Sequence, residues 1–228
     1  MKTDFPEDKQ VAYSEYIINE EKDTILEGNS TVYNYDGIKI SSGTYKKGEI
    51  VGKTTFYYDN GNIKSINNRD NNQLDIDIVY YYRNGKVERY SMFDELENLA
   101  FFIKFDEQGN PKNYKGNCVI ERYQYKIKYA EEFKTKINQH LKVGDTLKYK
   151  YIVANIPYTK RSFKIENLSV DNSKVKRIIK KRQPIYIDVQ EVLTKKGINR
   201  IRATAQYEFN DTKETVIKYT TFFDVNVY

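Results

Sequence analysis

The sequence predicts an all-β protein in two parts: an antiparallel sheet of stacked hairpins over residues 1–117 and a β-sandwich over residues 118–228. Three observations support this fold class. Turn glycines recur with a 24-residue period in the first part, which indicates a repeated unit. The second part consists of short runs that alternate at period two between turn residues. The chain has 22 Tyr and 11 Phe but no Trp, so rings that carry a hydroxyl must fill much of the interior.

The repeat is defined by four glycines with a 24-residue spacing: Gly37, Gly61, Gly85 and Gly109. The residue four positions before each glycine is aromatic in every copy, namely Tyr33, Tyr57, Tyr81 and Phe105. Asn60-Gly61 and Asn84-Gly85 are strong hairpin signals, because both positions of a two-residue turn favour positive φ. One hairpin cannot bury its aromatic face alone, so we expect the hairpins to stack into one sheet with these aromatic residues in a ladder.

Residues 1–28 precede the clear repeats. The stretch "VAYSEYIINE" has the apolar content of a strand, but Tyr13 stands where the 24-residue register would place a glycine. Terminal repeats are usually atypical, so we expect a degenerate first unit or a cap.

The stretch "GTYKKGEIVGKTTFYYDNGNIKS", residues 43–65, resembles the MORN-type repeat in the variant common in bacterial proteins labelled antitoxin-like repeat components. The shared pattern is Gly-x-aromatic, a Gly-containing turn, Gly-Lys, and an aromatic-rich strand ending in Asn-Gly. The match is good over residues 37–66, fair over 78–95 and poor over 97–117, and the resemblance covers residues 29–117 in all. It implies an elongated antiparallel sheet that serves as a scaffold or interaction surface, with lipid binding proposed for some such repeats.

The 24-residue register stops after Gly109, and the composition turns basic near Cys118. About seven short strands in roughly 110 residues are typical of an antiparallel β-sandwich. The stretch "LTKKGINRIRATAQY", residues 193–207, is similar to the late strands of bacterial immunoglobulin-like domains, which implies an immunoglobulin-like β-sandwich. Residues 130–141 alternatively form one short helix within a connection.

Charge is distributed unevenly along the chain. Nine acidic and three basic residues give residues 1–36 a charge of −6, residues 37–117 carry +1, and residues 118–228 carry +11. Any anionic partner should therefore meet the second part. The run "KVKRIIKKRQ", residues 174–183, concentrates six cations: Lys174, Lys176, Arg177, Lys180, Lys181 and Arg182.

Two interpretations of this basic run remain open. It forms a patch for anionic lipid or polymer, or it is a solvated strand-loop-strand with Ile178 and Ile179 in the core. Nucleic acid is not expected as a partner, because no nucleic-acid-binding motif accompanies the run.

Tyrosines on the repeat sheet are the candidates for contact with a protein. Tyr58, Tyr80 and Tyr82 are expected to face away from the aromatic ladder, and rigid amphipathic rings suit protein recognition. The alternative is that loops cover both faces of the sheet.

No set of residues typical of a catalytic, metal or cofactor site is evident in the sequence. His140 is the sole histidine and Cys118 the sole cysteine, neither lies in a recognisable nucleophile turn, and the two cannot fill a zinc site. Asp75 and Asp77 share one face of a strand, where we expect a charged sheet edge rather than a catalytic carboxylate pair.

We therefore expect no enzyme but a binding or adaptor protein, of immunity or antitoxin type, whose tyrosine-bearing sheet holds a partner protein. The alternative is an envelope- or surface-associated protein whose basic sandwich contacts anionic lipid or polymer, and a carbohydrate-active enzyme comes third. No run of 18 apolar residues exists, so no transmembrane segment is expected. The expected compartment is the cytoplasm if the chain start is native, and the periplasm or surface if a signal segment was removed.

Overall fold

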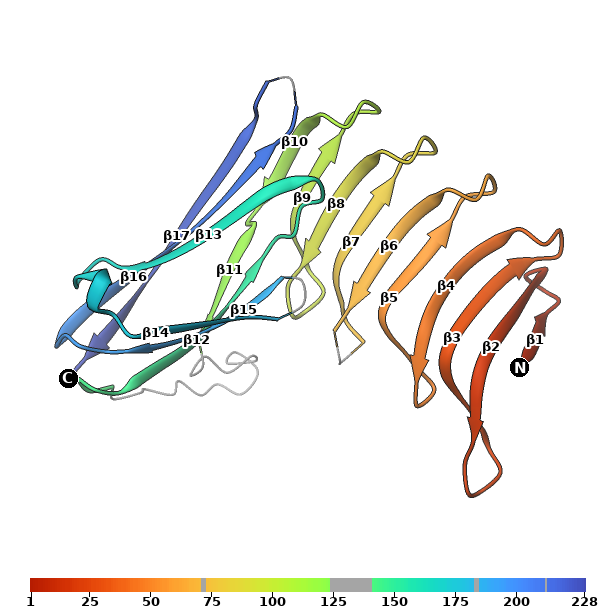
Figure 1. Cartoon of the computed structure of the whole chain (residues 1–228), viewed down its shortest axis with the longest axis horizontal. Helices are drawn as coiled ribbons and strands as arrows, with labels where there is room; N and C mark the ends of the chain where they lie inside the picture. The colour runs from red at the N-terminus through yellow and green to blue at the C-terminus, as the bar shows by residue number, and fades with distance from the viewer. Residues whose placement is uncertain (71–72, 124–140, 183–184, 212) are drawn as a thin grey trace. The chain divides into compact units, whose positions relative to one another are not determined.

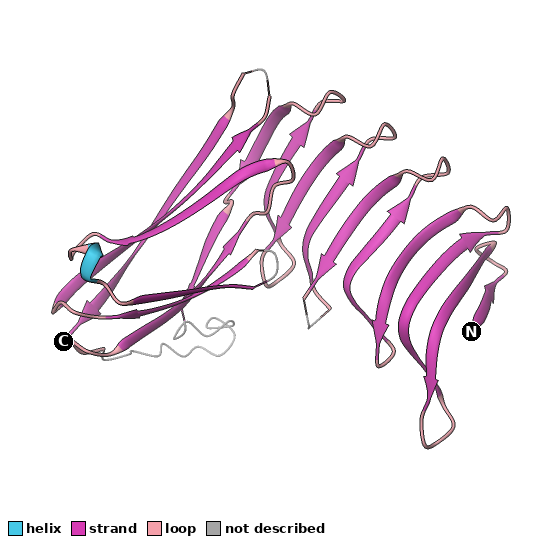
Figure 2. Cartoon of the chain, in the orientation of Figure 1, coloured by secondary structure: helices cyan, strands magenta, loops and turns pink. Residues whose placement is uncertain are grey.

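The computed structural model describes residues 1–70, 73–123, 141–182, 185–211 and 213–228. Within these ranges the chain is almost entirely strand and loop, with one short 3-10 turn at Asn172–Lys174 and no α-helix (Figure 2). The predicted all-β class is confirmed. The chain divides into two compact units, Met1–Lys115 and Gly116–Tyr228, which we call the repeat unit and the sandwich unit. The sequence places this division near residue 117.

The repeat unit is a single ten-stranded antiparallel sheet whose strands follow one another in chain order (Figure 1). Each strand therefore pairs only with the strands before and after it, and every connection is a hairpin. The strands are β1 (Lys2–Phe5), β2 (Gln10–Ile18), β3 (Thr24–Asn34), β4 (Lys39–Lys46), β5 (Glu49–Tyr57), β6 (Ile63–Arg69), β7 (Asp75–Tyr81), β8 (Val87–Phe93), β9 (Leu99–Phe105) and β10 (Pro111–Gly116).

The turns at one end of the sheet repeat the 24-residue register in their backbone conformation. Four glycines have positive φ, with values of 78°, 82°, 82° and 92° at Gly37, Gly61, Gly85 and Gly109. A Cβ added at Gly61 would meet nothing within 4 Å. Glycine is therefore favoured there by the backbone conformation and not by lack of space.

These turns differ from the two-residue Asn-Gly turns that the sequence predicts. Tyr58 N–H donates to the carbonyl of Asn62 at 2.8 Å, and Gly61 N–H donates to the carbonyl of Tyr58 at 3.0 Å. Such bonds close a three-residue loop, in which a type I turn is followed by one left-handed residue. Asn60 accordingly lacks positive φ, so the hairpin positions are confirmed but the prediction of positive φ at Asn is wrong.

Two hairpins at the opposite ends of the strands use the same loop without glycine. Gln73 and Glu97, which occupy equivalent positions in successive hairpins, have φ values of 67° and 60°. Their N–H groups donate to the carbonyls of Asp70 and Asp94 at 3.2 and 3.1 Å. The sequence offers no signal for these turns, because ordinary residues seldom adopt this conformation.

Residues 1–28 belong to the same sheet: they contribute β1, β2 and the first part of β3, with an irregularity in the pairing between Ser14 and Tyr16. Lys2 pairs with Tyr13, and Tyr13 pairs with Thr31. Tyr13, at the position where the 24-residue register would place a turn glycine, therefore lies within β2 and not in a turn.

One row of side chains crosses nine strands of the repeat unit in register and changes character along the way. The row is Lys2, Tyr13, Thr31, Ser42, Thr55, Ile66, Val79, Tyr90 and Ile103. Tyr13 is 52% exposed, Val79 is 8% exposed, and Tyr90 and Ile103 are fully buried. The core of the repeat unit therefore lies on its later hairpins, and its first hairpins present this face to solvent.

In the sandwich unit, the described residues form seven strands in two antiparallel sheets, ordered β11-β12-β15-β14 and β13-β16-β17. This is the strand order of the constant-type immunoglobulin fold, so the predicted immunoglobulin-like sandwich is confirmed. Rings from both sheets meet between them, with Tyr149 and Phe223 at 5.2 Å and Tyr151 and Phe163 at 5.3 Å between centroids. The strands are β11 (Val119–Tyr123), β12 (Thr146–Val153), β13 (Thr159–Asn167), β14 (Arg177–Arg182), β15 (Tyr186–Val192), β16 (Gly197–Phe209) and β17 (Val216–Val227).

The helix considered for residues 130–141 falls outside the described residues except for Leu141. The backbone of Leu141 forms an isolated parallel bridge with Val227.

Candidate functional site

Tyr58 and Tyr82, two of the tyrosines expected to contact a partner, bond instead to the neighbouring hairpin. The Tyr58 hydroxyl donates to the backbone carbonyl of Tyr81 at 2.7 Å, and the Tyr82 hydroxyl donates to that of Phe105 at 2.8 Å. Both side chains are half-buried. Burial raises the pKa of Tyr82, which favours the protonated, donating hydroxyl. The two hydroxyls therefore link successive hairpins of the repeat.

Different residues occupy the corresponding position in the outer hairpins. Asn34 and Asp106 take the place of Tyr58 and Tyr82, and each bonds within its own loop. The side-chain oxygen of Asn34 accepts from the Ile38 N–H at 2.8 Å, and that of Asp106 accepts from the Asn110 N–H at 2.8 Å. A tyrosine at this position reaches the next hairpin, whereas a short polar side chain closes its own turn.

Tyr80, the third candidate, has an internal partner as well. It is half-buried and pairs across the strands with Arg89, whose guanidinium lies 4.2 Å from the centre of the Tyr80 ring. This cation–π contact occupies one face of the ring. None of the three predicted tyrosines belongs to the strongly exposed large side chains of the repeat unit.

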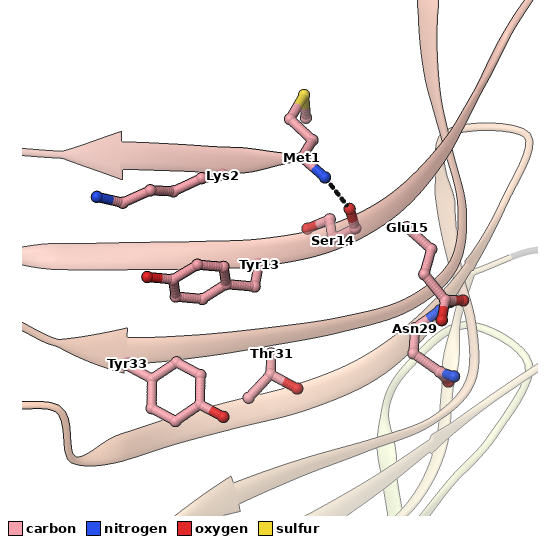
Figure 3. A pocket seen from close by; sticks show the side chains of 8 residues that line it. All are labelled: Met1, Lys2, Tyr13, Ser14, Glu15, Asn29, Thr31 and Tyr33. Carbon is pink, nitrogen blue, oxygen red and sulfur yellow. Dashed lines mark hydrogen bonds between the residues drawn. The ribbon is translucent and has the colours of Figure 1, made fainter.

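The exposed aromatic side chains gather on the first hairpins instead. Two adjoining shallow hollows of about 720 and 480 Å³ share Lys2, Tyr13 and Tyr33 as lining residues, and Tyr35 lines the second. Figure 3 shows the first hollow, with the side chains of Lys2, Tyr13 and Tyr33 on neighbouring strands. We call Lys2, Asp4, Tyr13, Tyr33 and Tyr35 the N-terminal tyrosine surface.

The rings of this surface are held in place by each other and by one carboxylate. Tyr13 and Tyr33 meet edge to face with centroids 6.0 Å apart. The Tyr35 hydroxyl donates to Asp4 Oδ1 at 2.6 Å, and this bond raises the pKa of Tyr35. Tyr13 and Tyr35 nevertheless remain 52% and 53% exposed. The surface thus presents oriented rings to solvent, which sequence reasoning missed because Tyr13 and Tyr35 lie outside the aromatic column of the repeat.

Further exposed apolar residues extend along β2. Tyr16, Ile17 and Ile18 are 46%, 49% and 63% exposed. Single exposed apolar residues are ordinary, but a group on one strand beside oriented tyrosines is a feature of interaction surfaces.

The basic run of residues 174–182 begins at the 3-10 turn and continues as β14, an edge strand that pairs only with β15. The interpretation that inserts two isoleucines in the core is wrong: Ile178 and Ile179 are 57% and 46% exposed. An edge strand has only one neighbour to cover it, so its side chains stay accessible, and cations there oppose edge-to-edge pairing.

Arg177 differs from the other cations of the run because it points into the sandwich. Its guanidinium bonds to the carboxylate of Glu191 at 2.7–2.8 Å, and its Nη1 donates to the carbonyl of Ile165 at 2.9 Å. Glu191 is 1% exposed and also accepts from Tyr149 and Asn167, each at 3.0 Å. Arg177 is therefore a structural residue, whereas Lys174, Lys176, Lys180, Lys181 and Arg182 remain exposed.

The predicted charged edge at Asp75 and Asp77 is wrong, because β7 lies inside the sheet between β6 and β8. Asp77 is 1% exposed and accepts from Asn68 Nδ2 at 2.6 Å and from the Tyr90 hydroxyl at 3.2 Å. Asp75 accepts from Arg69 Nε at 3.0 Å. Both carboxylates therefore bond to side chains of neighbouring strands within the sheet.

Cys118 is buried, and burial raises the pKa of its thiol to about 12. The thiolate, which is the nucleophilic form, is therefore disfavoured at neutral pH. His140, the partner considered for it, lies outside the described residues. Among the residues that the structure describes, no group of three or more His, Cys, Asp or Glu side chains could hold a metal ion.

None of the helical segments in the described ranges is sufficiently long and apolar to cross a membrane.

Comparisons with solved structures show only weak likeness. No family model matches the chain, and no curated protein matches it. A solved structure, the crystal structure of accessory secretory protein 1, 2 and 3 in Streptococcus pneumoniae, is similar over 41% of this chain and 17% of that chain. The identity is 14% and the TM-score 0.29, so this likeness carries no argument about fold or function.

Proposed function

We propose that the protein is a non-catalytic binding or adaptor protein that holds a partner protein on its repeat unit. The observation that carries this proposal is the N-terminal tyrosine surface, where rings oriented by neighbours remain half exposed. Tyrosine and tryptophan contribute much of the energy at protein interfaces because they are rigid and amphipathic. We therefore propose that the partner contacts the first hairpins and not Tyr58, Tyr80 and Tyr82.

Charge suggests the chemistry of the partner. Residues 1–36, which include this surface, carry nine acidic and three basic side chains. A partner with a basic, partly apolar surface would complement them. The resemblance to MORN-type, antitoxin-like repeats supports an immunity or antitoxin role, in which the partner is a toxin.

Site-specific cross-linking tests the proposal. A photoreactive phenylalanine analogue at position 13 should yield one discrete adduct in extracts of cells that carry the gene, and excess unlabelled protein should abolish it. The control replaces Tyr158, which is 78% exposed in the sandwich unit. The same adduct from position 158, or none from position 13, would reject the N-terminal tyrosine surface. If the analogue yields an adduct only when it replaces Tyr80, the partner contacts Tyr58, Tyr80 and Tyr82 and not the first hairpins.

A further inference from the structure

The outer face of the four-stranded sheet of the sandwich unit gathers cations that are distant in sequence. On β12, Leu147, Tyr149 and Tyr151 are buried, so the alternate residues Lys148 and Lys150 point outward. The same alternation turns other side chains of β14 and β15 outward. We call this group the cationic sheet face: Lys148, Lys150, Ile178, Lys180, Arg182 and Tyr186.

The strand register places these residues on three neighbouring rungs. One rung is Lys150, Asp188 and Lys180, and the next is Lys148, Gln190 and Ile178. A third is Ile152, Tyr186 and Arg182. Asp188 is thus the one carboxylate among four cations, and it pairs with Arg182 at 2.5 Å. With strands about 4.8 Å apart, the four cations lie within a small area.

The outer face of the three-stranded sheet differs because most of its cations are paired, although Lys218 on β17 is exposed and forms no salt bridge among the described residues. Four salt bridges of 2.7–3.4 Å join the paired cations to carboxylates: Lys160–Glu208, Lys164–Glu166, Arg200–Asp224 and Arg202–Glu166. On the cationic sheet face, the described residues form no salt bridge to Lys148, Lys150 or Lys180. Three lysines without a salt bridge therefore lie together on the cationic sheet face, whereas paired cations predominate on the outer face of the three-stranded sheet.

Apolar and aromatic groups lie among these cations. Ile178 is 57% exposed, although it is a large aliphatic side chain. Tyr186 is half-buried, and the Lys150 ammonium lies 5.4 Å from the centre of its ring. Exposed aliphatic residues and tyrosine beside lysines are suited to the boundary between lipid head groups and acyl chains.

We propose that the cationic sheet face binds the surface of an anionic lipid bilayer, which goes beyond the protein-binding function proposed for the repeat unit. Lys148, Lys150 and Lys180 contact phosphate head groups, while Ile178 enters the head-group layer. A soluble polyanion would satisfy the lysines but leave Ile178 in water. The exposed isoleucine is the observation that favours a bilayer over a polymer.

The test measures partition of the full chain onto vesicles of phosphatidylglycerol and phosphatidylcholine, with pure phosphatidylcholine vesicles as the neutral surface. The triple variant Lys148→Gln/Lys150→Gln/Lys180→Gln should lower partition roughly 100-fold, because each cation near an anionic surface contributes about fivefold. The matched control Lys160→Gln/Lys164→Gln/Lys218→Gln makes the same charge change on the other sheet. It should lower partition less than about threefold.

A single substitution separates lipid from polymer. Ile178→Ser should lower vesicle partition roughly five- to tenfold while leaving binding to inorganic polyphosphate unchanged. Equal loss in the two triple variants would show that net charge, not this face, drives binding. Vesicle partition that Ile178→Ser does not change would assign the lysines to a soluble polyanion, and absence of partition onto anionic vesicles would overturn the proposal outright.

Discussion

In the repeat unit, the hydroxyl of Tyr58 reaches the backbone of the next hairpin 23 residues away, and Tyr82 repeats the bond one unit later. In the sandwich unit, the carboxylate of Glu191 gathers donors from three other strands, between 14 and 42 residues away. The first arrangement is a series of local links, and each can be lost without the others. The second is one buried cluster, in which every member depends on the rest. Substitutions should therefore have small, separate effects in the repeat unit and large effects in the sandwich unit.

The largest expected effect comes from breaking the buried ion pair of the sandwich. Arg177→Met removes the cation from Glu191, which is 1% exposed, and leaves an uncompensated carboxylate. We expect the free energy of unfolding to fall by about 3–5 kcal/mol, measured by urea denaturation followed by circular dichroism. Lys181→Met, on the same strand but exposed, should change it by less than about 0.5 kcal/mol. Equal effects would contradict the structural role of Arg177.

The second-largest effect is expected from alkaline pH, which should lower the stability of the sandwich unit. Burial raises the pKa of Cys118 to about 12 and also raises the pKa of Tyr149, Tyr151 and Tyr207. The unfolded chain ionises these groups at their ordinary values of 9.0 and 10.0, whereas the folded state retains the protons. Their contribution to stability is therefore complete below about pH 9 and lost as pH rises toward the folded values. The urea midpoint should fall between about pH 9 and about pH 11, and a constant midpoint would contradict the burial of these groups.

Two tyrosines of β12 compare a buried hydroxyl that has a hydrogen-bond partner with one that has none among the described residues. The Tyr149 hydroxyl donates to Glu191, so Tyr149→Phe should lower the free energy of unfolding by about 1–2 kcal/mol. The Tyr151 hydroxyl is buried and has no hydrogen-bond partner among the described residues, so Tyr151→Phe should leave stability unchanged or raise it by about 1 kcal/mol. Thermal unfolding of the two variants side by side provides the check. A loss in Tyr151→Phe as large as that in Tyr149→Phe would show that its hydroxyl does have a partner.

Substitutions in the repeat turns should have smaller effects. Gly61 has a φ of 82° and free space around its Cβ position, so Gly61→Ala should cost about 1–2 kcal/mol of stability through backbone strain alone. Gly61→Asn is the matched control, because asparagine tolerates the left-handed region better, and it should cost less. If urea denaturation gives the reverse order, strain is not the reason for the glycine.

The sequence allowed prediction of the repeat unit to the extent that its contacts are local. Each hairpin pairs only with its neighbours, so a fixed 24-residue spacing was sufficient to predict the glycine turns and the chain-order sheet. The turns at Gln73 and Glu97 gave no signal, because those residues do not favour the conformation that they adopt. The roles of Tyr58 and Tyr82 were missed for another reason. Spacing locates a tyrosine in the repeat, but it does not say whether the hydroxyl finds a backbone carbonyl or water.

The sandwich unit was predictable as a class but not in its polar interior. Period-two runs indicated the strands, and their number matched the fold. Six cations in one run suggested a surface patch, yet Arg177 is buried against Glu191 while Lys148 and Lys150 join the exposed face from another strand. Such groupings depend on which strands pair, and residues from β12, β14 and β15 become neighbours only after folding.

The central claim is that tyrosines of the middle hairpins hold the repeat sheet together, whereas those of the first hairpins face outward. Urea unfolding of two double variants of the full chain tests it most directly. Tyr58→Phe/Tyr82→Phe removes two hydrogen bonds to neighbouring hairpins and should lower the free energy of unfolding by about 2 kcal/mol. Tyr13→Phe/Tyr16→Phe removes two exposed hydroxyls and should change it by less than about 0.5 kcal/mol. Equal losses, or a larger loss in the second variant, would contradict the account.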